Sequence, residues 1–357
     1  MKRALECARK ARCVAPPHPW VGCVIAKEGT VLSSGWTEPP GGEHAELVAI
    51  KKASGIDLQR ATLYLTLEPC CHRGRTPPCI DAITASGVKQ VVIGITDPDP
   101  NVRGKGVKQL QRAGIEVQTG LLKEEIEEEL VSYLHYMRKN SSYTVLKTVQ
   151  SVDGTIRTAN HSALSIIDHE AEEDAHRLRN HSQAVLIGAK TVLQDNPHLT
   201  VRHTPLKGPP PLRVVIDSHD TIPLNANIFK TDVAPTLCIT SGKKERNELL
   251  LSKGVDTLSW NSPKAVSCSF IQKELAQRKI LQLLVEGGAM TLSHFLQEQA
   301  FHELIVYIGP KILGKEGARF SEGVQLSSFT ESPVLRLVNS CQLGNSVRLT
   351  YRVSSST

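Results

Sequence analysis

Short apolar runs of strand length recur along the chain and alternate with segments of helical pattern. Such runs occupy residues 62–67, 90–95, 144–149, 212–217 and 281–286. A buried strand followed by a helix that covers it is the repeating unit of α/β domains. We therefore predict an α/β fold along the whole chain.

The length of the chain indicates two domains. A chain of 357 residues, 40% of them hydrophobic, is long for one core and can bury two. The alternation of strands and helices runs through residues 1–121 and restarts at Tyr143. A segment rich in glutamate and then in basic residues lies between them, with the pattern of an amphipathic helix. We predict a first domain over 1–121, a connecting helix over 122–142 and a second domain over 143–357.

Apolar patterning and cysteine content bear on where the chain works. No apolar run reaches the roughly 18 residues that a membrane span needs, and the first residues lack the apolar centre of a signal peptide. Nine cysteines in so long a chain do not form a disulfide scaffold, and three of them crowd into residues 70–79. In a reducing compartment such a cluster is typical of a metal or catalytic site. We expect a cytoplasmic protein with no membrane partner.

The charge balance narrows the class of substrate. The formal net charge of +6 is modest, and the basic residues are dispersed among acidic ones. This balance suits a phosphorylated small substrate or weak RNA binding. An enzyme that acts on bases within nucleic acids would need a clustered basic face and aromatic side chains that stack a flipped base. Aromatic residues make up only 4% of the chain, so we expect a small-molecule substrate and no nucleic-acid partner.

The most specific pattern is His44-Ala45-Glu46, followed by Pro69-Cys70 and then Cys79. One histidine and two cysteines suit zinc, and three protein ligands leave a fourth position open for water, as in catalytic zinc sites. Glu46 lies two residues after His44, close enough to carry protons without binding the metal. Zinc nucleobase deaminases divide these duties in the same way. We predict one zinc ion per chain on the histidine and the two cysteines, with Glu46 as the catalytic proton carrier.

The spacing of the two cysteines departs from the common deaminase form. Eight residues separate Cys70 from Cys79, where many zinc deaminases have about two. The insert ends in Pro77-Pro78, which favours a helix start, so that Cys79 can face the metal from the first turn. Cys71 is not expected to bind, because adjacent cysteines seldom both reach one tetrahedral ion. A purely structural zinc module is an alternative that Glu46 and the three-ligand count oppose.

At this point the sequence resembles a known family. Residues 66–79, TLEPCCHRGRTPPC, are similar to the signature of the bifunctional riboflavin-biosynthesis deaminase/reductases. The resemblance continues through residues 21–25, 44–46, 97–106, 151–154, 191–197, 199–202 and 285–288. It implies a cytidine-deaminase-like three-layer domain followed by a dihydrofolate-reductase-like α/β domain.

The resemblance also implies two successive reactions. The first is zinc-dependent hydrolytic deamination of 2,5-diamino-6-ribosylamino-pyrimidinone 5′-phosphate. The second is NADPH-dependent reduction of the ribosyl group to ribityl. Basic residues suit such a substrate, because an arginine offers paired donors to a phosphate. Assembly into a homo-oligomer is left open by the sequence.

Residue by residue, the resemblance extends to the second domain. The positions that it implies for substrate are Lys147, Ala163, Arg179, Leu199, Arg202 and Glu286. The positions that it implies for the cofactor are Gln150, Ser165, Ile167, Thr191, Asp195, Ser218 and the segment that begins at Gly288. No Gly-x-Gly-x-x-Gly follows a strand, so a dinucleotide-binding fold of that type is unsupported. A helix that begins after Gly287-Gly288 can instead hold a cofactor phosphate on its free amides, although a plain strand-to-helix turn explains the same residues.

Several positions depart from the family pattern. The family commonly has Ser-x-Trp-Ile-Thr where residues 163–167 read ALSII, so Ser165 replaces the tryptophan and Ile167 the threonine. Gln150 replaces a small residue near the cofactor, and His18 replaces an asparagine expected to touch the substrate of the first domain. The zinc set is intact. The alternative function is therefore a deaminase whose degenerate second domain serves as a scaffold.

Overall fold

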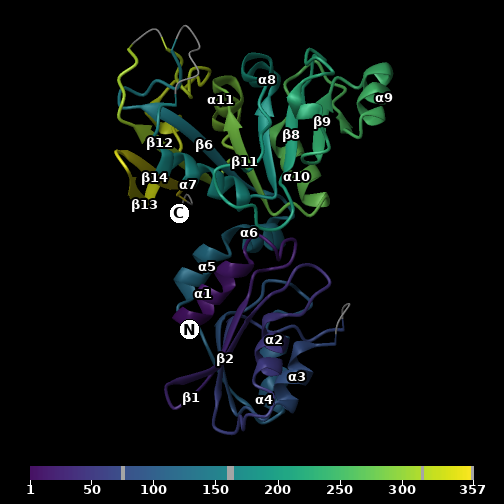
Figure 1. Cartoon of the computed structure of the whole chain (residues 1–357), viewed down its shortest axis with the longest axis vertical. Coiled ribbons are helices and arrows are strands. Elements are labelled where there is room, and N and C mark those ends of the chain that lie inside the picture. Colours follow the sequence, from purple (N-terminus) through teal and green to yellow (C-terminus); the bar gives the residue numbers. More distant parts are fainter. Residues whose placement is uncertain (74–76, 159–164, 315–316, 355–357) are drawn as a thin grey trace. The chain divides into compact units, whose positions relative to one another are not determined.

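The chain divides into two compact units, Met1–Asn140 and Ser141–Thr357 (Figure 1). The computed structural model describes residues 1–73, 77–158, 165–314 and 317–354. Ala163, expected at the substrate of the second domain, lies outside the described residues. No described helix is long and apolar enough to cross a membrane.

The first unit is built on a five-stranded sheet in the order β2-β1-β3-β4-β5. Its elements are α1 (Lys2–Ala11), β1 (Gly22–Lys27), β2 (Thr30–Trp36), α2 (Ala45–Lys52), β3 (Thr62–Leu67), α3 (Cys79–Ala85), β4 (Gln90–Ile95), α4 (Lys105–Arg112), β5 (Glu116–Thr119), α5 (Lys123–Glu129) and α6 (Val131–Lys139). Strands β1 and β2 pair antiparallel, whereas β3, β4 and β5 are parallel.

Helices cover both faces of this sheet. A Cβ on Gly22 would meet the backbone of α1, and one on Gly35 would meet the backbone of α2. Gly35 pairs with Cys23, the residue after Gly22, and successive residues of a strand face opposite sides. Helices α1 and α2 therefore lie on opposite faces, with α3 and α4 on the side of α2 and α5 on the side of α1 (Figure 1). The predicted three-layer α/β domain is confirmed.

The segment 122–142 contains two helices in the first unit rather than one connecting helix. The break falls at Leu130, whose φ of −96° and ψ of 14° are not helical. Glu129 explains the attachment of α5, because its buried carboxylate accepts bonds from Arg9 Nε at 3.0 Å and Trp20 Nε1 at 3.2 Å. In α6 the Tyr133 hydroxyl donates to Asp97 Oδ1 at 3.0 Å. These buried polar contacts hold both helices on the sheet.

The second unit is built on a nine-stranded sheet in the order β10-β9-β8-β7-β11-β6-β12-β14-β13. Its elements are β6 (Tyr143–Ser151), α7 (His169–Asn180), β7 (Ala184–Gly188), α8 (Ala189–Asp195), β8 (Leu212–Asp217), the 3-10 helix η1 (Asn227–Phe229), β9 (Thr236–Thr240), α9 (Lys244–Ser252), β10 (Asp256–Ser259), α10 (Cys268–Gln277), β11 (Gln282–Gly287), α11 (Ala289–Gln297), β12 (Glu303–Gly309), the 3-10 helix η2 (Phe329–Glu331), β13 (Leu335–Leu343) and β14 (Ser346–Val353). The strands from β6 to β12 are parallel, and β13 and β14 are antiparallel.

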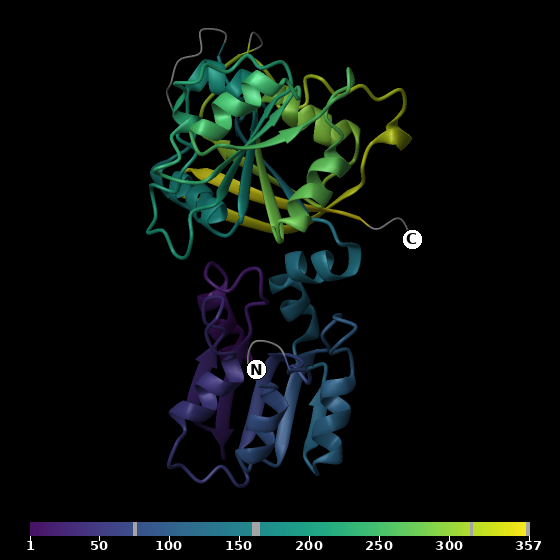
Figure 2. The ribbon, with the colours of Figure 1, turned by 90° about the vertical axis from the view of Figure 1, so that its right-hand side faces the viewer.

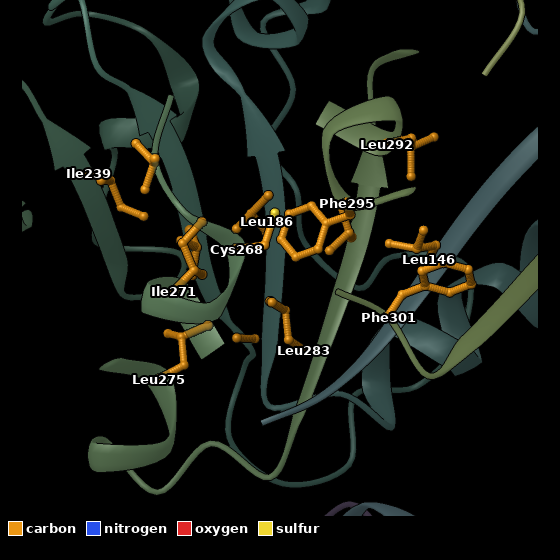
Figure 3. Packing of buried hydrophobic residues seen from close by; sticks show 14 of the residues in the cluster. Leu146, Leu186, Ile239, Cys268, Ile271, Leu275, Leu283, Leu292, Phe295 and Phe301 are labelled. Carbon is orange, nitrogen blue, oxygen red and sulfur yellow. The ribbon is translucent and has the colours of Figure 1, made fainter. Parts of the chain in front are cut away.

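The core of the second unit fills the space between its sheet and helices α10 and α11. Figure 3 shows Phe295 of α11 beside Leu186 and Leu283 of the central strands, with Ile271 and Leu275 of α10 nearby. Figure 2 shows the strands of this unit with helices on either side. This mixed sheet covered by helices agrees with the predicted reductase-type α/β domain.

Strand order decides where a site forms in the second unit. The chain runs outward from β7 to β10 and then returns to place β11 between β7 and β6. The loops that leave the carboxyl ends of β7 and β11 therefore diverge, which opens a crevice at that edge.

Candidate active sites

Three elements of the first unit bring the predicted zinc residues together. His44 is the N-cap of α2, Cys70 follows β3, and Cys79 is the first residue of α3. Pro78 is the N-cap of α3, as the two prolines predict, and no hydrogen bond is lost by its missing N–H. Two helix starts and one strand end thus meet at one edge of the sheet.

The ligand atoms have the spacing of a metal site. His44 Nδ1 lies 3.1 Å from Cys79 Sγ and 3.6 Å from Cys70 Sγ, and all three atoms lie within 4.8 Å of one another. Bond lengths of about 2.0 Å to nitrogen and 2.3 Å to sulfur put tetrahedral zinc ligands roughly 3.5–3.8 Å apart. The donor set and its spacing therefore fit zinc.

Electrostatics at this site favour a thiolate at Cys70 and raise the pKa of Glu46. A hydrogen bond from the Cys79 thiol, supported by His44, lowers the pKa of Cys70 to about 4. Burial raises the pKa of Glu46, which is 3% exposed and lies in the first turn of α2. A carboxylate with a raised pKa is a better proton acceptor than an ordinary glutamate side chain. Glu46 has the environment that a proton carrier needs.

Cys71 and His18 occupy different surroundings. Cys71 Sγ lies 3.5 Å from the Asn101 carbonyl oxygen, a hydrogen-bond distance for a thiol donor, and is not grouped with the three zinc residues. Its pKa is raised by burial, which favours the neutral thiol. His18 is exposed, in the loop that follows α1. The geometry therefore places Cys71 against a loop.

Two further groups of described residues have metal-ligand chemistry. They are His169, Glu172 and His203, and Cys268, His294 and Glu298. In the second group Glu298 accepts the Cys268 N–H at 2.9 Å, and His294 Nε2 lies 2.9 Å from the Val266 carbonyl oxygen. In the first, His169 contacts Glu173 at 3.3 Å and Glu172 accepts the Ser165 hydroxyl. Hydrogen bonds within the chain account for both groups.

The second unit has a cavity of about 200 Å³ at the edge where β7 and β11 diverge. It is lined by Arg179, Ile187, Thr191, Asp195, Pro197, Leu199, Arg202 and Glu286. Most of these residues were predicted to hold substrate or cofactor, and the geometry brings the two sets together. Ile187 and Pro197 were assigned no role. Pro197 lies within the family-like segment 191–197, and Ile187 is signalled only by its position at the end of a strand.

Three largely buried charges organise this cavity. Arg179 donates to Glu286 through Nε and Nη2, each at 2.8 Å, and Lys147 Nζ lies 3.7 Å from the same carboxylate. Although burial opposes it, the charges of Arg179 and Lys147 lower the pKa of Glu286 to about 2. Two cations on one carboxylate leave a net positive charge, and Arg202 adds another at the rim. The cavity is suited to an anion such as a phosphate.

The loop that carries Leu199 and Arg202 is held in a specific conformation. Leu199 has a φ of 53°, in the left-handed region, which costs a leucine on the order of 1–3 kcal/mol. Arg179 Nη1 donates to the carbonyl of Thr200, and His176 Nδ1 accepts the Arg202 N–H at 3.0 Å. These bonds offset the backbone cost and fix the cavity wall.

The remaining predicted residues lie at the same carboxyl edge of the sheet but outside the cavity lining. Gly288 N–H donates to Thr191 Oγ1 at 2.6 Å, which joins the end of β11 to α8. Ser218 follows β8, and Gln150 lies near the end of β6. Ser165 donates to the carbonyl of Ile167 at 3.0 Å, and a Cβ on Gly309 would meet the Ile166 carbonyl at the end of β12.

Together the two units define a class, a zinc-binding deaminase region followed by a reductase domain. Residues 1–95 match the family model for the cytidine and deoxycytidylate deaminase zinc-binding region, and residues 142–349 match the RibD C-terminal domain.

Relatives cover the whole chain. The chain is 42% identical over 315 residues to riboflavin biosynthesis protein RibD of Aquifex aeolicus, covering 88% of this chain and 87% of that protein. It is 39% identical over 356 residues to RibD of Chlamydia trachomatis, with 98% and 94% covered. A solved deaminase/reductase from Thermotoga maritima superposes with a TM-score of 0.87 at 34% identity, with 99% and 97% covered. The chain belongs to the RibD family, the bifunctional deaminase/reductases of riboflavin biosynthesis, and its cofactors are zinc and NADPH.

The paired charges of the cavity predict a dependence of stability on pH. The folded pKa of Glu286, about 2, lies below its ordinary value of 4.5. This pairing therefore contributes its full stability above about pH 4.5 and loses it as pH falls through 2, a change of about 3 kcal/mol. Glu286→Gln should lower the free energy of unfolding by about 3–5 kcal/mol at neutral pH, because it leaves two buried cations unpaired.

Urea-induced unfolding is measured at pH values from 7 down to 2. Hydrogen exchange of the β11 amides monitors the unfolding of the second unit. The gap between wild type and Glu286→Gln should narrow as the pH falls. The exposed Glu245→Gln serves as a matched control and should stay within about 0.5 kcal/mol of wild type. A gap that is constant across this range would contradict the assignment of the buried pairing.

Proposed function

We propose that the first unit removes the exocyclic amine of 2,5-diamino-6-ribosylamino-pyrimidinone 5′-phosphate, and that the second reduces the ribosyl group of the product to ribityl with NADPH. The observation that carries the proposal is the meeting of His44, Cys70 and Cys79 beside a buried Glu46. The Thermotoga maritima protein is described as a diaminohydroxyphosphoribosylaminopyrimidine deaminase and 5-amino-6-(5-phosphoribosylamino)uracil reductase, which supports this substrate.

The first unit supplies ligands and a proton carrier. His44, Cys70 and Cys79 would hold zinc, and zinc when bound makes a water reactive near neutral pH. Glu46 takes a proton from the attacking water and delivers it to the departing amine. Its burial excludes bulk solvent, and its raised pKa suits both steps.

The metal assignment predicts different outcomes for neighbouring cysteines. Cys79→Ser should lose most of its zinc, because a hydroxyl is a poor substitute for a thiolate ligand. Cys71→Ser, the matched control, should keep about one zinc per chain, since its thiol lies against the Asn101 carbonyl oxygen. Elemental analysis of freshly purified protein measures both. If Cys79→Ser kept its full zinc content and Cys71→Ser lost zinc, Cys71 rather than Cys79 would be the ligand.

The proton-carrier assignment separates metal binding from chemistry. Glu46→Gln should retain zinc, because Glu46 is outside the ligand set. Ammonia release should fall by at least roughly 100-fold, the usual scale for loss of a general acid–base group. The assay is ammonia release from the diamino-pyrimidinone phosphate, with zinc measured on the same sample. Near-normal deamination would show that another group carries the proton.

In the second unit we propose that the cavity holds the sugar phosphate. Arg179 and Arg202 bring positive charge to its lining, and Lys147 lies beside the lining, 3.7 Å from Glu286, which also holds Arg179. Leu199 contributes apolar surface, and Ala163 is proposed for the substrate by resemblance alone. For NADPH, which supplies the hydride, we propose residues of β6 and α8, of the loops after β8 and before α7, and of the segment that begins at Gly288. They are Gln150, Thr191, Asp195, Ser218, Ser165 and Ile167, together with that segment.

A degenerate second domain that acts only as a scaffold is not favoured, because the RibD C-terminal domain matches residues 142–349 and the full-length relatives are RibD proteins. We also propose that the substrate is a phosphorylated pyrimidine, that nucleic acid is not a partner and that the enzyme works in the cytoplasm. Assembly into a homo-oligomer is left open, as it is by the sequence.

The departures at Ser165 and Ile167 predict weak cofactor binding with measurable turnover. Serine in place of tryptophan removes a large apolar surface, and isoleucine cannot replace a threonine hydroxyl. Each lost contact costs on the order of 1 kcal/mol. Restoring Ser165→Trp and Ile167→Thr together should lower the dissociation constant of NADPH by about tenfold or more.

NADPH fluorescence titration measures this affinity, and oxidation of NADPH with the deaminated product measures turnover. Leu251→Met, a change at an exposed side chain of α9, serves as the control and should leave both unchanged. No NADPH oxidation in wild type or the double variant, beside intact deamination, would restore the scaffold alternative.

A further inference from the structure

Glu68 is a buried carboxylate that the zinc and proton chemistry does not use. It is 3% exposed and lies between β3 and Cys70. Its oxygens accept three backbone N–H groups, from Asp97 at 3.2 Å, Gly104 at 3.0 Å and Val107 at 3.1 Å. A carboxylate that accepts several amides forms strong charge-assisted bonds, so this contact is rigid.

The three amides belong to one loop and the helix start that follows it. Strands β3 and β4 are parallel, with Leu67 beside Ile95, so the loops after them leave the same edge of the sheet. One loop carries Cys70, and the other runs from β4 to α4. Cys71 Sγ lies 3.5 Å from the Asn101 carbonyl oxygen, which places the second loop against the zinc-binding segment.

Gly106, in the first turn of α4, packs against the same Glu68-Pro69 segment. A Cβ at this position would lie 2.6 Å from the Pro69 carbonyl oxygen and 3.0 Å from Glu68 Oε1. The first distance is shorter than a Cβ contact allows, and the second is tighter than an ordinary van der Waals contact. The first turn of α4 therefore approaches the Glu68-Pro69 segment as closely as a glycine allows.

Stability alone would explain a carboxylate here, because Glu68 caps α4, whose own N-cap is Gly104 and has no side chain. The bonds to Glu68 also join the β4–α4 loop to the zinc-binding segment, because Glu68 lies two residues before Cys70. We propose that Glu68 is a positioning residue of the deaminase reaction. Its carboxylate, which packs against Gly106, holds the β4–α4 loop in position, and this loop forms one wall of the pyrimidine-binding site. This inference rests on the proposed deaminase function.

Glu68→Gln tests the proposal, because an amide has one acceptor oxygen and turns its NH₂ toward an N–H donor. With the wall loosened, KM for the diamino-pyrimidinone phosphate should rise about tenfold or more, while kcat stays within about threefold. Zinc should remain at about one per chain. Ile126→Val, which trims a buried side chain of α5 that packs on Gly94, is the control for lost stability and should leave KM unchanged.

Gly106→Ala tests the same contact without changing the Glu68 side chain itself. Alanine is better than glycine in a helix, so an increase in KM must come from the displaced contact with Glu68 and Pro69. Agreement of the two variants in KM, with zinc retained, supports the proposal. An unchanged KM with a lowered melting temperature would show that Glu68 only caps α4. Loss of zinc would show that Glu68 supports metal binding. Either result overturns the proposal. A wild-type enzyme that does not deaminate would instead refute the proposed function.

Discussion

Parallel strand pairing is the constraint on which both candidate sites depend. Parallel strands send all their carboxyl-terminal loops to one edge of a sheet, so residues far apart in sequence meet there. In the first unit, β3 and β4 bring the zinc-binding segment beside the loop held by Glu68. In the second unit, β7 and β11 bring α8 and Glu286 to one cavity. The catalytic residues are spread along the sequence for this reason.

The fold was predictable where one physical signal dominated. Apolar runs marked strands such as β3, β4 and β11, because a strand that is buried on both faces consists mainly of apolar residues. Prolines marked the start of α3 at Cys79. The break at Leu130 was missed, because apolar residues continue through it at helical spacing, at Ile126, Leu130 and Leu134. The bonds of Glu129 and Tyr133, which hold each helix on the sheet, are tertiary contacts without a sequence signal.

The sites were predictable to different depths. The spacing of His44, Cys70 and Cys79 matches a coordination requirement, so the sequence alone identifies them as a group. The reductase positions came from resemblance, since a single arginine or glutamate in a sequence has no signature of its own. Glu68 lies inside the family-like segment 66–79 but was assigned no role. Its partners are backbone amides, which every residue except proline carries, and no sequence pattern distinguishes them.

Three glutamates with little access to solvent show how surroundings decide what a carboxyl group does. Glu286 faces two cations, so its pKa is lowered and it stays charged as an organiser of the cavity. Glu46 faces His44 and the two thiols in a buried pocket, and burial raises its pKa, which lets it exchange protons. Glu68 faces backbone amides and is fixed by them. Burial is common to all three, so burial alone does not separate these roles. The partner set does: cations favour a permanent charge, a buried position beside thiols favours the proton-carrying form, and backbone amides favour a rigid joint. A substitution by glutamine therefore tests a different property at each position, namely ion pairing, proton transfer and loop geometry.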